Sequence, residues 1–209
     1  MKRSRERDGK ERPERRSSVH NTFHNSGTII MSYLKSLPEG SNLRDLFPRY
    51  PRHSRPLLEF HEELLRGDGA LSPEQKELIA AYTSGLNACS YCYGIHTATA
   101  EAFGVEPGLL ENLVNDLDSA PIDDAMRALL AYVRKVTQTP SRIVPADSEA
   151  VYAAGWSEDA LFEAVATCAT FNLMNRLVDG LGMEATAENK REAGQYLRDA
   201  GYAELIKTL

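Results

Sequence analysis

The sequence predicts an all-α fold, and three observations support that prediction. From residue 54 onward, apolar residues recur at spacings of three and four, the period of an amphipathic helix. Capping residues, prolines and glycines divide this pattern into helix-sized segments. No stretch alternates apolar and polar residues over the length of a strand. With 209 residues, 42% of them hydrophobic, the chain has the size of one domain with a real core.

The first 30 residues differ from the rest of the chain. They hold eight Lys/Arg and four Asp/Glu, a net charge of +4, and almost no apolar residue before Ile29. This composition predicts a disordered basic tail at 1–30 and a helical domain at 31–209. Met31 opens a stretch of ordinary composition. We therefore favour a misassigned upstream initiation codon over the alternative, a basic interaction arm.

Two predicted helices surround a glycine-containing turn. The apolar residues of the first are Leu57, Leu58, Phe60, Leu64 and Leu65, and Gly67 and Gly69 end it. The second helix begins at Ser72, which caps it, with Pro73 in the first helical position and Glu74 in the first turn. It should extend to about residue 86.

Six further helices are expected. They cover about 90–103, 107–115, 123 or 124 up to Pro140, 145–154, a long segment after the Ser157 cap, and about 188–199. The long helix is apolar on most sides between 161 and 178, so we expect it to be buried. The last helix is amphipathic, and we expect it to be mostly exposed.

Charge and cysteine content exclude several classes of protein. Residues 31–209 carry sixteen Lys/Arg and twenty-six Asp/Glu, and an acidic body does not favour nucleic-acid binding. No apolar run has the length of a membrane span. Three cysteines do not make a secreted disulfide framework, and no signal-peptide core follows the basic start. We expect a cytoplasmic protein.

The segment from 77 to 96 concentrates the residue types of thiol chemistry. It contains Glu77, then the pair Cys89 and Cys92, then His96. On a helix, Cys92 and His96 are four residues apart and share one face. If the two helices form a hairpin, Glu77 can approach His96, raise the imidazole pKa and orient the ring. The imidazole can then take the Cys92 proton and generate a nucleophilic thiolate.

The order of the two thiols is not settled by the sequence. The helix N-terminus favours a thiolate at Cys89, whereas contact with His96 favours Cys92. We expect Cys89 to be the more exposed of the two. On these grounds we assign Cys92 as the attacking thiol and Cys89 as the resolving thiol.

Other residues carry simpler interpretations. The Cys-x-x-Cys pair could be half of a zinc site, but no second pair completes it, and we expect no metal or cofactor. The two cysteines could also be buried small hydrophobes, which leaves Glu77 and His96 unexplained. Cys168 is interpreted as a buried structural thiol. Asn172, Asn175 and Arg176 either line a cavity near the thiols or make inter-subunit bonds.

The spacing Glu-x11-Cys-x2-Cys-x3-His resembles the signature of the alkylhydroperoxidase AhpD-like proteins, within the carboxymuconolactone decarboxylase superfamily. The flanking sequences L-I-A-A-Y-T-S-G-L-N-A-C and H-T-A-T-A-E-A-F-G-V are similar to its peroxidase-related branch. The similarity covers about residues 32–205. It implies an AhpD-like helical bundle that assembles into trimers or hexamers. In the founding group, the residue before the second cysteine is a histidine of the proton relay; here it is Tyr91.

The resemblance implies a thiol-dependent peroxidase. Cys92 would be oxidised by a hydroperoxide and resolved by Cys89, with Glu77 and His96 as the proton relay. The reductant would be a dithiol or lipoyl-type carrier, whose identity does not carry over. Two alternatives stay open: a carboxymuconolactone decarboxylase-like lyase, against which the intact cysteine pair argues, and a non-enzymatic thiol redox sensor.

Overall fold

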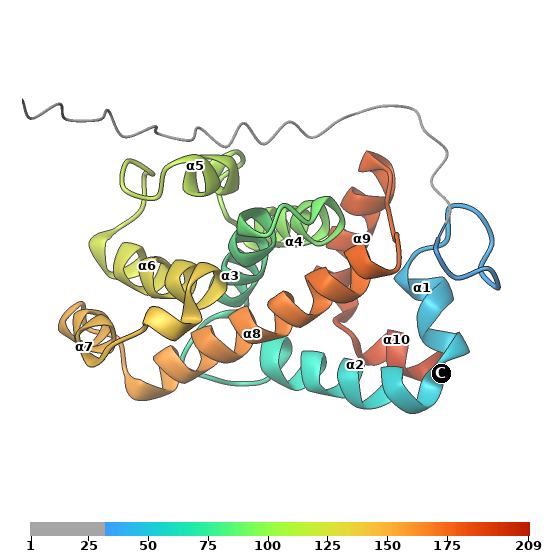
Figure 1. Cartoon of the computed structure of the whole chain (residues 1–209), viewed down its shortest axis with the longest axis horizontal. Coiled ribbons are helices and arrows are strands. Elements are labelled where there is room, and N and C mark those ends of the chain that lie inside the picture. Colours follow the sequence, from blue (N-terminus) through green and yellow to red (C-terminus); the bar gives the residue numbers. More distant parts are fainter. Residues whose placement is uncertain (1–31) are drawn as a thin grey trace, which may run out of the picture.

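The computed structural model describes residues 32–209, and these form helices with no strand among them (Figure 1). The predicted all-α class is therefore confirmed. The predicted tail at 1–30 and the ordinary start at Met31 lie outside the described residues.

Each predicted helix is present, with small differences at its ends. The α-helices are α1 (Leu43–Leu46), α2 (Pro51–Arg66), α3 (Pro73–Leu86), α4 (Ser90–Phe103), α5 (Leu109–Asn115), α6 (Asp124–Gln138), α7 (Pro145–Ala153), α8 (Glu158–Gly180), α9 (Ala187–Ala200) and α10 (Ala203–Lys207). Single 3₁₀ turns at Phe47–Arg49 and Pro140–Arg142 follow α1 and α6. The sequence did not predict α1 or α10, because four or five residues are too few to show a period.

The hydrophobic core has two parts, which meet along the long helix α8. One part is built from α3, α5, α6, α7 and the first half of α8, and it contains Cys168. The other is built from α1, α2, α4, α9 and the second half of α8, and it contains Cys89 and Cys92. Cys89 and Cys92 therefore lie in a different part of the core from the third thiol.

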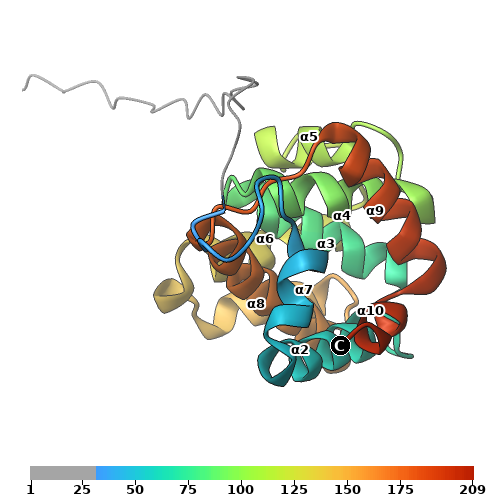
Figure 2. The ribbon, with the colours of Figure 1, turned by 90° about the vertical axis from the view of Figure 1, so that its right-hand side faces the viewer.

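The α3–α4 hairpin is enclosed by later parts of the chain. Figures 1 and 2 both show α9 lying against α4 and the C-terminal helix α10 beside α2. Because α9 and α10 return to the hairpin, residues near the C-terminus can reach a site formed near residue 90. The prediction that α9 is mostly exposed is confirmed, although Gly194 and Leu197 on its inner face are buried.

Two glycines allow α4 and α9 to pack closely. A Cβ atom at Gly194 would lie 2.6 Å from the Cβ of Ala98 and 2.9 Å from its backbone carbon. A Cβ atom at Gly94 would lie 2.4 Å from the side chain of Lys190. The lack of a side chain at these two positions thus allows α4 and α9 to cross at short distance.

We expect Gly194→Ala to lower the free energy of unfolding by about 1–2 kcal/mol, because the overpacking cost exceeds the gain in helix propensity. Gly180 is a matched control, since a Cβ there meets no atom within 4 Å. Gly180→Ala should leave stability unchanged or raise it by up to about 1 kcal/mol. Urea denaturation measures both variants. Equal effects at the two positions would contradict a close α4–α9 contact.

Candidate active site

The turn between α3 and α4 places Cys89 at a helix start. The Asn87 N–H donates to the Thr83 carbonyl, and the Cys89 N–H donates to the Ser84 carbonyl at 3.0 Å. Between them, Ala88 adopts φ = 56°, a left-handed conformation that non-glycine residues adopt infrequently. Cys89 then occupies the N-cap position of α4, so both cysteines lie at the positive end of the helix dipole.

A buried amide network holds this turn against α8. The Asn87 side chain donates to the side-chain oxygens of Asn172 and Asn175, at 3.1 and 2.8 Å. Asn175 in turn donates to the Ser84 hydroxyl at 3.0 Å, and Arg176 donates to the Asn172 side chain. None of these residues of α8 lines the pocket beside Cys92, which was one of the two alternatives, and bonds to a partner subunit stay a prediction. These side chains satisfy one another and fix the hairpin that carries the cysteines.

The two thiols differ in environment. Cys89 is fully buried, and Cys92 is 3% exposed, so the expectation that Cys89 is the more accessible thiol is wrong. Cys92 lines a pocket, whereas Cys89 does not. The hydrogen bond with Cys92, followed by burial, raises the pKa of Cys89, which keeps that group a neutral thiol. All three cysteines are free thiols.

A buried carboxylate joins α2, α3 and α4. Glu77 Oε2 lies 2.6 Å from His96 Nδ1, and Glu77 Oε1 accepts a hydrogen bond of 2.7 Å from Arg66. Burial acts to raise the pKa of Glu77, but the charge of His96 and the hydrogen bonds from His96 and Arg66 outweigh it, so the pKa is lowered. An ionised carboxylate only accepts hydrogen bonds, so Nδ1 of His96 carries a proton and Nε2 remains free for other chemistry.

Arg66 is a residue of this cluster that the sequence did not single out. It lies in the last turn of α2 and also donates to the Leu197 carbonyl of α9, at 3.0 and 3.2 Å. Its guanidinium lies over the ring of Phe103 at 5.2 Å. Because an arginine before a glycine is common at helix ends, nothing local marked it as the partner of Glu77.

Tyr91, the residue between the two cysteines, has a structural contact. Its hydroxyl accepts a hydrogen bond of 3.2 Å from the Leu43 N–H, which ties the start of α1 to α4. Burial raises the pKa of Tyr91 to about 12, so the phenol is neutral at physiological pH. The position that holds a relay histidine in the founding group here connects two elements of the fold.

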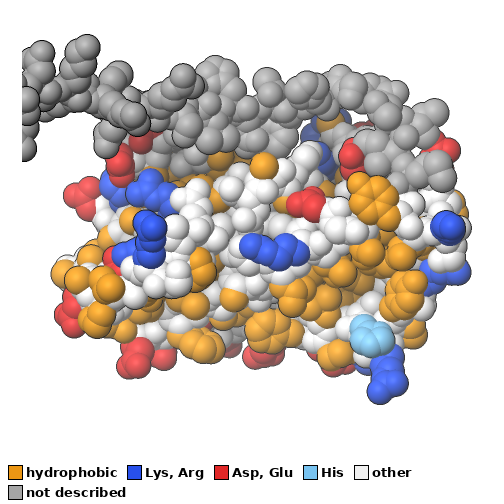
Figure 3. Space-filling view, in the orientation of Figure 1, with side chains coloured by type: hydrophobic (Ala, Val, Ile, Leu, Met, Phe, Trp, Pro, Cys, Tyr) orange, Lys and Arg blue, Asp and Glu red, His pale blue; other side chains and the backbone are white. Residues whose placement is uncertain are grey.

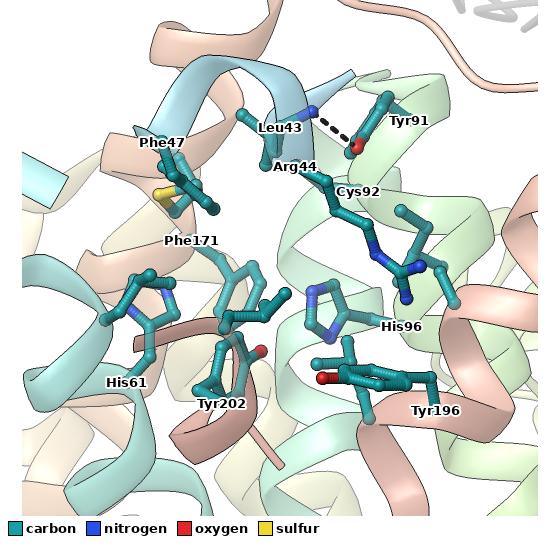
Figure 4. Close-up of a pocket in the computed structure, with 16 residues that line it drawn as sticks. Leu43, Arg44, Phe47, His61, Tyr91, Cys92, His96, Phe171, Tyr196 and Tyr202 are labelled. Carbon is teal, nitrogen blue, oxygen red and sulfur yellow. Dashed lines mark hydrogen bonds between the residues drawn. The ribbon is translucent and has the colours of Figure 1, made fainter. Parts of the chain in front are cut away.

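An apolar pocket opens beside Cys92 and His96 (Figure 4). Its volume is about 70 Å³, several times the roughly 10–15 Å³ that one water requires, so a small organic molecule fits. The aromatic side chains that line it are Phe47, Tyr91, Phe171, Tyr196 and Tyr202, with His61 and His96. Arg44 extends from α1 across the pocket, and its guanidinium lies 4.5 Å from the centre of the Tyr196 ring.

His61 lies on the side of the pocket formed by α2. Its Nδ1 is 2.7 Å from the Leu57 carbonyl, which can only accept, so Nδ1 carries the proton of a neutral ring. Burial lowers the pKa of His61 from 6.5 to about 4. His61 also contacts the ring of Tyr202, with 5.2 Å between the ring centres. His61 is thus a buried residue of the pocket wall.

Cys168 makes its contacts in the other part of the core, away from Cys89 and Cys92. It is fully buried, and its sulfur lies 3.2 Å from the Thr137 hydroxyl in the other part of the core. The interpretation as a buried structural thiol is confirmed. Across residues 32–209, no cluster of histidine, cysteine and acidic side chains could hold a metal ion. In the same described part, no helix has the length and apolar character needed to cross a membrane.

Comparison with known proteins supports the resemblance seen in the sequence. Residues 51–135 match the model of the carboxymuconolactone decarboxylase family. The structure is similar to that of an uncharacterised peroxidase-related protein with an alkylhydroperoxidase AhpD core from Ralstonia eutropha JMP134. The two share 26% identity over 72% of this chain and 79% of the other, with a TM-score of 0.66. Comparison with curated protein sequences finds no match.

Two further solved structures extend the comparison. An uncharacterised peroxidase-related protein from Silicibacter sp. TM1040 is 26% identical over 71% of this chain and 78% of its own, with a TM-score of 0.67. The debrominase Bmp8, solved with 2,3,4-tribromopyrrole, is 19% identical over 75% of this chain and 81% of its own, with a TM-score of 0.60. The last match concerns the fold alone. Together these comparisons confirm the predicted resemblance to AhpD-like proteins and to their peroxidase-related branch.

The buried neutral His61 should make folding pH-dependent. Its folded pKa of about 4 lies below the ordinary 6.5, so the unfolded chain binds the extra proton between these values. The stabilisation is complete above pH 6.5 and is lost as pH falls toward 4, by on the order of 3 kcal/mol. Urea denaturation at pH 7 and pH 5 should show this loss in the wild type. The loss of unfolding free energy between pH 7 and pH 5 should be smaller in His61→Phe. Equal losses in the wild type and the variant would contradict the low pKa assigned to His61.

Proposed function

We propose that this protein is a thiol-dependent peroxidase, a disulfide oxidoreductase that reduces hydroperoxides through Cys92 and Cys89. The observation that carries the proposal is the position of Cys92. Cys92 lines an apolar pocket together with His96. Nδ1 of His96 is bound to the buried Glu77 carboxylate. A thiol, a base and a group that orients the base are the parts of an activated nucleophile.

In the first half of the reaction, His96 Nε2 takes the proton of Cys92. The thiolate attacks the terminal oxygen of the hydroperoxide, so an S–O bond forms and the O–O bond breaks. The leaving alkoxide receives the proton from His96 and departs as an alcohol. Cys92 is thereby oxidised to a sulfenic acid, and the hydroperoxide is reduced by two electrons.

In the second half, Cys89 loses its proton and its thiolate attacks the sulfur of the sulfenic acid. The S–S bond forms, the S–O bond breaks, and the departing hydroxide takes up that proton and leaves as water. A dithiol reductant, of lipoyl or related type, then restores both thiols by exchange through a mixed disulfide. The hydrogen bond with Cys92 and burial raise the pKa of Cys89, which favours Cys92 over Cys89 as the thiol that reacts first. The proposal includes no metal or organic cofactor. We also propose a cytoplasmic location.

Two other activities compete with this proposal. A lyase reaction of the kind named for the carboxymuconolactone decarboxylase family would not need the cysteine pair. A redox sensor would use the same disulfide but would be oxidised only once without a reductant cycle. The debrominase of similar fold adds debromination as an outcome to be measured. Catalytic turnover with a hydroperoxide separates the peroxidase from all three.

The cysteine variants test the mechanism. We expect Cys92→Ser to abolish hydroperoxide consumption with dithiothreitol or dihydrolipoamide as donor, because no sulfenic acid forms. Cys89→Ser should retain only a single slow turnover with hydroperoxide, because the oxidised Cys92 has no resolving thiol. A coupled steady-state assay with hydrogen peroxide and cumene hydroperoxide measures both.

Cys168→Ser is the matched control, because this thiol is buried in the other part of the core. It should retain full turnover. Mass mapping of the oxidised wild type should find a Cys89–Cys92 disulfide. Wild-type turnover in both Cys92→Ser and Cys89→Ser would exclude the thiol mechanism.

We also propose that the chain forms a homo-oligomer, a trimer or hexamer, through the exposed face of α8. Phe162 and Leu173 on this helix are 71% and 51% exposed. Eleven residues are close to three turns, so both lie on one face. Figure 3 shows hydrophobic side chains gathered along α8 on the surface that faces the viewer. The expectation that α8 is buried is confirmed for the side that faces the core, but Phe162 and Leu173 lie on an exposed face.

The test of assembly is a charge on that face. We expect Phe162→Asp or Leu173→Asp to shift the oligomer toward monomer, because a carboxylate would be buried in the interface. Tyr152→Asp on α7, also at an exposed aromatic position, should leave the assembly intact. Sedimentation velocity measures the three variants. A monomeric wild type at micromolar concentration would overturn the proposal.

A further inference from the structure

Tyr202 has an unpaired hydroxyl at the pocket. The residue is 6% exposed, and its side-chain oxygen is buried with no hydrogen-bond partner in the described chain. Tyr202 lines the same pocket as Cys92 and His96. Figure 4 shows its oxygen directed toward His96 rather than away from the pocket. A buried hydroxyl without a hydrogen-bond partner costs about 1–3 kcal/mol of stability, so this unsatisfied group requires an explanation.

The backbone fixes Tyr202 in position. The N–H groups of Tyr202 and Ala203 both donate to one carboxylate oxygen of Glu62 on α2, at 2.6 and 3.1 Å. Gly201 precedes them with φ = 61°, and a Cβ there would lie 2.6 Å from that same oxygen. The ring is also 5.6 Å from the Arg66 guanidinium and contacts His61. Three residues of one helix, α2, therefore hold this side chain where it is.

Its chemical state is that of a donor. Burial and the negative charge of Glu77 raise the pKa of Tyr202 well above 10, so the phenol keeps its proton at neutral pH. The neighbouring His61 is neutral, and the remaining wall is mainly apolar. A fixed O–H group in such surroundings interacts strongly with any negative charge that develops beside it.

We propose that Tyr202 is a catalytic residue whose hydroxyl donates a hydrogen bond to the leaving oxygen of the hydroperoxide. This assignment rests on the proposed peroxidase function. While Cys92 attacks the terminal oxygen, the S–O bond forms, the O–O bond breaks and negative charge gathers on the leaving oxygen. Tyr202 stabilises that charge until the proton taken from Cys92 by His96 arrives. The products are the Cys92 sulfenic acid and an alcohol, and Tyr202 ends the step unchanged.

Other polar groups around the pocket each have a contact within the chain. The hydroxyl of Tyr91 accepts the Leu43 N–H, and the guanidinium of Arg44 stacks on Tyr196. Nδ1 of His61 is bound to a carbonyl, and its neutral ring offers only an acceptor at Nε2. Tyr202 differs from these groups, because its hydroxyl oxygen is buried and makes no hydrogen bond in the described chain.

The test uses the basicity of the leaving group. An alkoxide from tert-butyl hydroperoxide needs a donor, whereas the weakly basic acetate from peracetic acid needs little stabilisation. We expect Tyr202→Phe to lower the second-order rate of Cys92 oxidation by tert-butyl hydroperoxide by about 100-fold, as for loss of an oxyanion donor. The rate with peracetic acid should change less than about 3-fold, in keeping with a charge-dependent role. Stopped-flow fluorescence or competition kinetics measures both rates.

Phenylalanine keeps the ring and its packing, so the variant separates the hydroxyl from the fold. Tyr132→Phe, in the other part of the core, should change neither rate. An equal loss with both oxidants would make Tyr202 structural, and no loss with either would remove its role; both outcomes overturn the assignment. If the wild type reacts with neither oxidant, the proposed peroxidase function fails first and this inference with it.

Discussion

The buried carboxylate of Glu77 is the charge around which this half of the molecule is organised. An unpaired carboxylate in a protein interior costs several kcal/mol, and a single removed partner costs about 3–5 kcal/mol. Glu77 is fully buried, and its two oxygens are bound separately by Arg66 and His96. Satisfying this charge therefore requires α2, α3 and α4 to meet at one point. Arg66 extends the requirement to α9 through its two hydrogen bonds to Leu197.

This constraint explains why the pocket lies where it does. Once Glu77 fixes the ring of His96, Cys92 on the same face of α4 lines the same pocket as that ring. Closure of α9 and α10 over this point removes the thiol from bulk water, which strengthens each electrostatic interaction near it. The amide network around Asn87 and Asn175 separately holds the hairpin against α8. Reactivity and rigidity are thus supplied by different sets of residues.

The sequence predicted the elements that have local signals. The caps at Ser72 and Ser157 accept hydrogen bonds from the third residue after each, as expected of a helix start. The spacing from Glu77 to His96 placed four site residues that the structure brings together through the α3–α4 hairpin. Such predictions succeed because capping and helical periodicity depend on residues a few positions apart.

The remaining parts of the site could not be predicted for the same physical reason. Arg66 belongs to the preceding helix, and Tyr202 lies more than a hundred residues after His96. Each has an ordinary local sequence, and only tertiary packing gives it a function. The relative burial of the two thiols was also missed, because the turn at Ala88 directs Cys89 into the core rather than toward solvent.

The contrast between Tyr91 and Tyr202 shows how one chemical group can serve either structure or reaction. Both are buried phenols that line the same pocket, and burial raises the pKa of each. Tyr91 lies next to the nucleophile in sequence, yet its oxygen is occupied by the Leu43 N–H of α1. Tyr202 is remote in sequence, yet its oxygen is unoccupied and faces the pocket. Both phenols keep an O–H to donate, but only at Tyr202 does a new partner satisfy a buried hydroxyl that has none, so the remote residue is the better candidate for catalysis. A relay histidine between the cysteines is therefore dispensable if the C-terminal segment supplies a donor from the opposite wall.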